Sequence, residues 1–212
     1  HGHLDHLMDV VAFLDPETEG EATLYCGRVA ARTLSAQALI TDNVVEVKPG
    51  MRWSLGAVEM AVYQGKHAQP GITYKMRTLC SPRLLRYLPN ALFLAGANRY
   101  FPEGGETLVY EVAAEGKRVL LLGSLGLSIE ENYPTGIDLL VLPFQGEKRL
   151  EEKALEIVER LRPRRIILDH FDDAFPPASR SVDTRRFKAL MDREFPGIQT
   201  VKPKAGKEIT IL

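Results

Sequence analysis

The chain of 212 residues is long enough for one domain with a substantial buried core. Charged residues make up 26% and hydrophobic residues 45%, a balance typical of globular rather than disordered proteins. With a formal net charge of −1, we expect no strong attraction to nucleic acid or to an anionic membrane. Cys26 and Cys80 form no CxxC pair, so neither a disulfide framework nor a cysteine zinc site is indicated. The sequence shows no signal peptide and no bilayer-length apolar run, from which we expect a cytoplasmic protein.

The hydrophobic pattern alternates between strand and helix periods along the chain. In order, it predicts a short helix over 7–13, a strand over 22–25, a helix over 29–39, strands over 44–47 and 57–63, a hairpin of 107–113 with 119–122, a strand over 138–142, a helix over 150–161, a strand over 166–168, a helix near 182–195 and a strand over 208–212. The clearest helix is 150–161, whose apolar residues share one face and which Pro163 ends. Strands alternating with helices predict a layered α/β domain.

The segment 81–103 departs from this alternation, because its many leucines are interrupted by Pro82, Pro89 and Gly96. One interpretation is a lid that lines an apolar substrate pocket and offers an arginine to a carboxylate or phosphate. The other is an inserted helix that packs on the core or on a second subunit. In the latter case the protein would be a homo-oligomer. The sequence leaves both open.

Histidine placement is the strongest functional signal in the chain. The five histidines are His1, His3, His6, His67 and His170. The first three fall within HGHLDH, and the other two each follow the end of a predicted strand, where α/β proteins gather their chemistry. Isolated histidines are usually structural, and histidine-rich ends are often purification tags, but tags are uninterrupted runs. Five imidazoles plus Asp5 exceed the roughly four ligands of one tetrahedral site, which indicates two adjacent metal positions holding one or two ions.

HGHLDH resembles the HxHxDH motif of the metallo-β-lactamase superfamily, and later segments resemble its other motifs in the expected order. Gly65-Lys66-His67-Ala68 looks like the next metal histidine, and Leu168-Asp169-His170-Phe171-Asp172-Asp173 looks like the final one. Leu121-Leu122-Gly123-Ser124 is similar to the strand end that usually carries an aspartate bridging two metals. The resemblance spans nearly the whole chain and is nearest to the branch of lactonase-like metal-dependent hydrolases.

The resemblance implies a four-layer αββα sandwich formed by a single domain over 1–212, in which 81–103 would be the lid insertion of the first interpretation above. Because the superfamily has strands before its first motif, we expect this sequence to lack N-terminal strands and the natural chain to start before His1.

The resemblance also implies the ligands. His1, His3 and His67 would hold the first metal, and Asp5, His6 and His170 the second, with Asp5 also the catalytic carboxylate. Zinc fits both sets, and manganese or iron is the alternative. Side chains that would support the ligands by hydrogen bonds are Ser124, Asp169, Asp172 and Asp173. Since Ser124 replaces the bridging aspartate with a neutral hydroxyl, we expect the two positions to differ in affinity.

The activity implied is hydrolysis of an ester, lactone, amide or phosphoester by a metal-activated water. The expected partner is a small-molecule substrate, with no role for nucleic acid or membrane, and no substrate-binding residue is predicted. Two alternatives remain: a phosphodiesterase or ribonuclease of the same fold, and a metal-binding scaffold protein without turnover.

Overall fold

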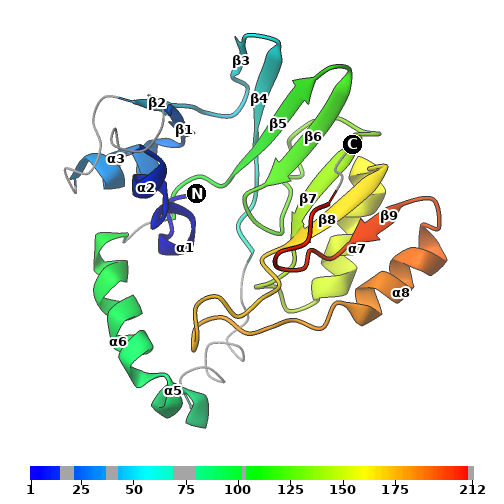
Figure 1. Cartoon of the computed structure of the whole chain (residues 1–212). Helices are drawn as coiled ribbons and strands as arrows, with labels where there is room; N and C mark the ends of the chain where they lie inside the picture. The colour runs from blue at the N-terminus through cyan, green and yellow to red at the C-terminus, as the bar shows by residue number, and fades with distance from the viewer. Residues whose placement is uncertain (15–21, 37–42, 69–79, 102–103, 210–212) are drawn as a thin grey trace.

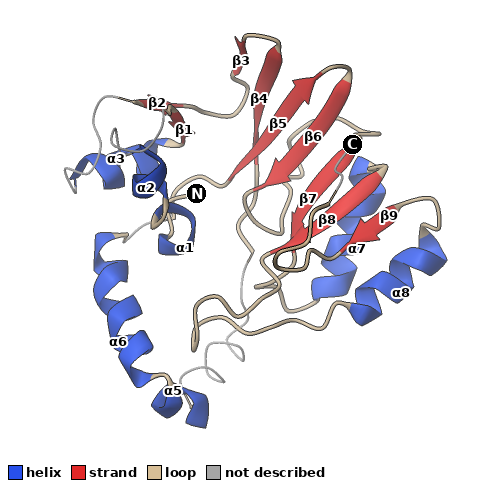
Figure 2. Ribbon diagram, in the orientation of Figure 1, coloured by secondary structure: helices blue, strands red, loops and turns tan. Residues whose placement is uncertain are grey.

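The computed structural model describes residues 1–14, 22–36, 43–68, 80–101 and 104–209. Within them, a seven-stranded sheet has the order β3-β4-β5-β6-β7-β8-β9, and a two-stranded sheet pairs β1 with β2 (Figures 1 and 2). The strands are β1 (Leu24–Cys26), β2 (Val44–Glu46), β3 (Arg52–Leu55), β4 (Val58–Gln64), β5 (Leu108–Ala114), β6 (Lys117–Leu122), β7 (Leu139–Pro143), β8 (Arg165–Asp169) and β9 (Gln199–Val201). The helices are α1 (Leu4–Leu7), α2 (Val10–Leu14), α3 (Arg28–Ala36), α5 (Pro82–Arg86), α6 (Leu88–Ala97), α7 (Leu150–Leu161) and α8 (Arg185–Glu194), with a 3-10 turn η1 (Asn98–Tyr100).

The large sheet is antiparallel from β3 to β6 and parallel from β6 to β9. The β5–β6 hairpin turns at Glu115 and Gly116, which both have positive φ (51° and 73°), as a two-residue turn between right-twisted strands requires. β4, β6, β7 and β8 all run in one direction, so their carboxyl ends meet at one edge of the sheet. That edge carries the candidate site.

Alternation along the strands builds a core on each face of the large sheet. Ala61 and Tyr63 of β4 face the main core, which α7 and α8 cover, whereas Val62 faces the small sheet. The two sheets are joined by the Tyr110 hydroxyl, which donates to the Tyr25 carbonyl at 3.0 Å. Beyond the small sheet, α1, α3 and α6 share a third cluster. The layer order is therefore helix, sheet, sheet, helix, as the sequence predicts.

Most predicted elements form within a few residues of their expected bounds, and the helix 150–161 has the predicted ends. Arg162 follows it in the left-handed conformation (φ 47°), which closes the helix before Pro163. The single helix predicted over 7–13 is wrong in detail, because a turn at Met8 and Asp9 separates α1 from α2.

Three further differences concern strands and the expected insertion. β3 and β9, of four and three residues, were not predicted. Glu208 and Ile209 form no strand, since β9 takes the edge beside β8, and the rest of the expected strand 208–212 lies outside the described residues. The segment 81–103 is helical over α5, α6 and η1; residues 102–103 are not described.

None of the helices among the described residues has both the length and the apolar character of a membrane span.

Candidate metal centre

All six predicted ligands line one cleft of about 180 Å³ at the carboxyl edge of the large sheet. His67 follows β4, Ser124 follows β6, Gln145 follows β7 and His170 follows β8. HGHLDH enters from the other side, where α1 turns its residues toward the same edge. The structure thus brings together side chains up to 169 positions apart in the sequence.

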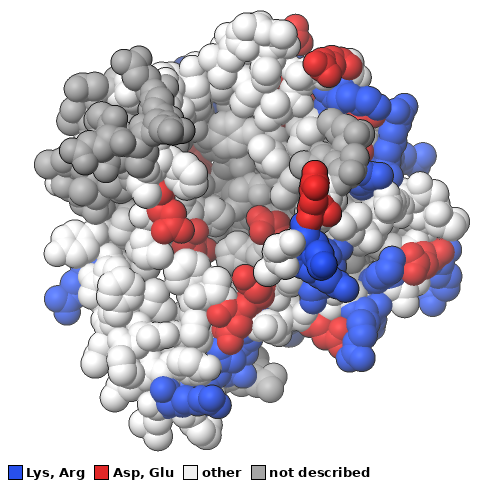
Figure 3. Space-filling model, in the orientation of Figure 1, with Lys and Arg blue, Asp and Glu red and all other residues white. Residues whose placement is uncertain are grey.

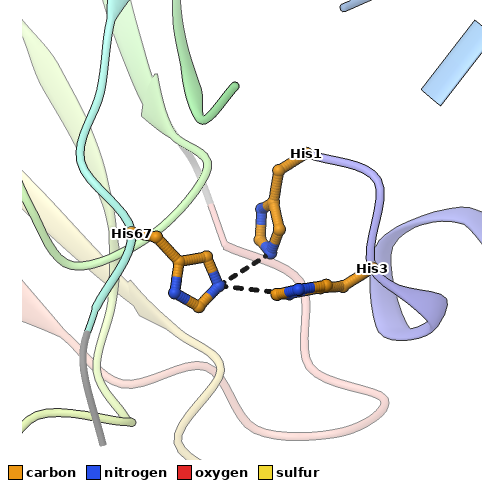
Figure 4. A group of neighbouring side chains, drawn as sticks. All are labelled: His1, His3 and His67. Atoms are coloured by element: carbon orange, nitrogen blue, oxygen red, sulfur yellow. Dashed lines mark hydrogen bonds between the residues drawn. The ribbon is translucent and has the colours of Figure 1, made fainter. Parts of the chain in front are cut away.

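His1, His3 and His67, here named the three-histidine group, converge on one point (Figure 4). His67 Nε2 lies 3.1 Å from His1 Nε2 and 3.2 Å from His3 Nδ1. The three rings are nearly perpendicular to one another, with interplanar angles of 81° to 85°. Three imidazole nitrogens aimed at a common point from three directions form the kind of donor set that zinc prefers.

The hydrogen bonds behind these rings fit a metal better than a proton network. His67 Nδ1 lies 2.6 Å from the Ala68 carbonyl and donates to it, so its Nε2 faces the group with a free lone pair. His1 Nδ1 is buried and has no hydrogen-bond partner in the described structure. Burial lowers the pKa of His3, and the neighbouring His67 lowers it further, which favours the neutral imidazole that ligation needs.

Asp5, His6 and His170 lie beside the three-histidine group. Asp5 Oδ2 is 3.1 Å from His170 Nε2 and 3.7 Å from His6 Nε2. Potential ligand atoms of His1, Asp5 and His6 also lie within 4.8 Å of one another. His1 therefore belongs to both clusters, whereas the resemblance implies a role at the first position alone.

Electrostatics divides this second cluster into a neutral and an ionic part. Burial lowers the pKa of His6 to about 4, against the raising influence of Asp5. Burial alone would raise the pKa of Asp5, but the His170 hydrogen bond and the charges of His6 and His170 bring it down to about 2. The same hydrogen bond raises the pKa of His170. Without a metal, these shifts favour a protonated His170 beside the Asp5 carboxylate and a neutral His6.

His170 stands in the left-handed region, with φ of 56°, which is uncommon for a residue other than glycine. The Asp169 side chain accepts a hydrogen bond from the His170 backbone nitrogen at 2.7 Å and so stabilises this turn. Backbone strain of this kind costs on the order of 1–2 kcal/mol and is concentrated at functional sites. Here it directs the ring toward Asp5.

The other predicted supporting residues have different roles in the structure. Ser124 Oγ accepts a hydrogen bond from the Ala68 backbone nitrogen at 2.9 Å, which fixes the turn that follows His67. Asp173 pairs with Arg83 of α5 and does not reach a histidine. The Asp172 backbone carbonyl accepts from the Gln145 side chain at 3.2 Å, which ties the loops after β7 and β8 together.

Gly104 is a contributor that sequence reasoning does not find. Its carbonyl accepts from the Gly2 backbone nitrogen at 2.6 Å, and a Cβ at this position would lie 2.6 Å from His3 Nε2. Only a glycine lets this backbone pass so close to the His3 ring. The Gly104-Gly105 pair is the single signal in the sequence, and it is too common to indicate such a contact.

Comparison with known proteins bears on the fold. No protein-family model and no curated protein sequence matches the chain. Among solved structures, Igni18, a metallo hydrolase of the archaeon Ignicoccus hospitalis, matches with a TM-score of 0.60 and 15% identity over 99% of this chain and 76% of its own. The metallo-β-lactamase fold protein YhfI of Bacillus subtilis matches with a TM-score of 0.57 and 12% identity, over 98% of this chain and 74% of YhfI. Zinc-bound PqqB of Methylobacterium extorquens matches with a TM-score of 0.54 and 12% identity, over 95% of this chain and 69% of PqqB.

The chain therefore has the metallo-β-lactamase fold, which confirms the predicted fold class. The histidine cluster lies where the sequence predicts a metal site. None of the three similar structures is described as a lactonase, so the lactonase-like branch stays a prediction.

Proposed function

We propose that this protein is a metal-dependent hydrolase that holds its principal metal ion, zinc by ligand type, at the three-histidine group. The observation that supports the proposal is the convergence of three imidazole nitrogens. His1 Nε2 and His3 Nδ1 lie 3.1 and 3.2 Å from His67 Nε2. A divalent ion bound there would supply a Lewis acid and would lower the pKa of a coordinated water to about 7.

The neighbouring pair supplies proton chemistry when the three-histidine group alone is loaded. Asp5 Oδ2 then holds a proton on His170 Nε2 across 3.1 Å, and both side chains line the cleft. His170 can give that proton to a leaving group, and Asp5 keeps the resulting imidazole oriented. A second ion would be held by Asp5, His6 and His170, and His170 could act as a ligand only after losing that proton.

The test is metal content and turnover on one panel of substrates. We expect zinc- or manganese-loaded protein to hydrolyse at least one of the esters, lactones, amides or phosphodiesters offered, and His67→Gln to lose both metal and at least a hundredfold in rate. Asp5→Asn should lower the rate at least tenfold. Asp9→Asn, an exposed carboxylate four residues on, is the matched control and should leave the rate unchanged. Tight metal binding without turnover on any substrate would identify a metal-binding protein instead.

A further inference from the structure

A second and larger hollow opens directly from the metal cleft. Its volume is about 500 Å³, within the range of small-molecule binding sites. His3, Asp5 and His170 form the side that it shares with the cleft. The opposite side is formed by α6 and by the loop that follows β8. A molecule whose reacting group sits at the metal centre would place its remaining part in this hollow.

Away from the histidines and Asp5 the lining is uncharged and mainly apolar, with Asn98, Gln145 and Ser179 as its polar residues. Leu94 and Ala95 of α6 face Phe175 and Ala178 of the loop across the hollow, and α6 has no charged residue along its length. Among the described residues that line the hollow, none is a lysine or arginine. The surface over α6 is correspondingly almost free of charge, whereas lysine and arginine gather on the side of α8 (Figure 3).

One of these polar residues, Ser179, is engaged in holding the wall. Ser179 Oγ accepts from the Phe175 backbone nitrogen at 2.7 Å and donates to Asp173 at 3.0 Å. Asp173 in turn pairs with Arg83, which anchors α5 to the loop. Arg83, one of the three arginines in this segment that could meet an anionic substrate, is therefore neutralised by Asp173. Apart from His170, whose ring is already paired with Asp5, the described residues that line the hollow offer no cation to a carboxylate or phosphate.

We propose that this hollow, lined by Leu94, Ala95, Phe175 and Ala178, binds the uncharged apolar chain of the substrate, so that the enzyme acts on esters, lactones or amides of apolar acids. The identity of the reacting group rests on the proposed hydrolase function, whereas binding of the chain does not. Each methylene fully buried strengthens binding about fourfold, and for a hollow open to solvent we expect roughly twofold.

The binding test uses zinc-loaded protein and two uncharged probes, butanamide and octanamide, in isothermal titration calorimetry. Four additional methylene groups predict octanamide binding about 16-fold tighter. Ala95→Trp places an indole in the hollow and should weaken octanamide at least tenfold while leaving butanamide within a factor of two. Leu92→Trp, on the same helix but 65% exposed and outside the hollow, is the control and should change neither.

The kinetic test is KM for 4-nitrophenyl esters from acetate to octanoate. We expect KM to fall with chain length in the unmodified protein and in Leu92→Trp, and to lose that dependence in Ala95→Trp with metal content unchanged. Octanamide binding no tighter than butanamide, or equal losses for both probes in Ala95→Trp, would overturn the inference even if short esters are hydrolysed. Octanamide binding without turnover on any substrate would instead overturn the hydrolase function and leave the apolar pocket standing.

Discussion

Substitution of Gly104 by alanine tests whether His3 holds a metal. A Cβ at this position would lie 2.6 Å from His3 Nε2, 3.0 Å from Cε1 and 3.1 Å from Cδ2. Atoms that are not bonded normally stay about 3.5 Å or more apart, so the ring must withdraw by roughly 1 Å. The ring is the free end of a side chain at the rim of the cleft, and it can move without disturbing the core.

The expected result is a loss of metal affinity without a loss of stability. Metal–ligand distances tolerate changes of about 0.2 Å, so a ring displaced by roughly 1 Å contributes little to binding. We expect zinc to bind 10- to 100-fold more weakly in Gly104→Ala, or about 1.4–2.7 kcal/mol. The free energy of unfolding of the metal-free protein should change by less than about 1 kcal/mol. Competition with a chromophoric chelator measures the first quantity, and urea unfolding the second.

The matched control is Gly96→Ala in α6, where an added Cβ meets nothing within 4 Å. Alanine in this last turn of α6 should stabilise the protein slightly, by up to about 0.5 kcal/mol, and leave zinc affinity unchanged. Zinc affinity in Gly104→Ala equal to that of the unmodified protein would refute the reasoning, because His3 would then not be a ligand of the tightly bound ion.

Three further predictions concern the neighbouring groups. Ser124→Asp should raise occupancy of the weaker metal position, whereas the uncharged Ser124→Asn should not, as metal analysis after dialysis would show. Because the pKa of His170 is raised, a proton on its ring competes with a metal ion. Metal binding at His170 should therefore release a proton and should weaken as the pH falls through that pKa. Calorimetric titration in buffers of different ionisation enthalpy measures the released proton. Arg83→Met should cost about 1 kcal/mol of stability and speed proteolysis within 81–101, because Asp173 no longer anchors α5, while Arg86→Met should do neither.

The sequence by itself determined the local features of this protein. Apolar spacing and Pro163 define the helix α7 because both act within a few residues of the chain. The alternation of strands and helices defines the layered fold, since the direction and covering of strands follow from their connections. The metal motif HGHLDH and the histidines His67 and His170 were identifiable from the sequence. Histidine is rare in this chain, and its five residues occur either in that motif or directly after a predicted strand.

The tertiary structure decided what surrounds those residues. Gly104 beneath His3, Ser124 behind the His67 turn and the Arg83–Asp173 pair join segments that lie 56 to 101 residues apart, and no local period encodes such contacts. The same is true of the apolar hollow, since its walls come from α1, α6 and the loop after β8. Periodicity shows which face of an element is buried, but the partner it meets depends on how all layers pack, which only the folded chain specifies.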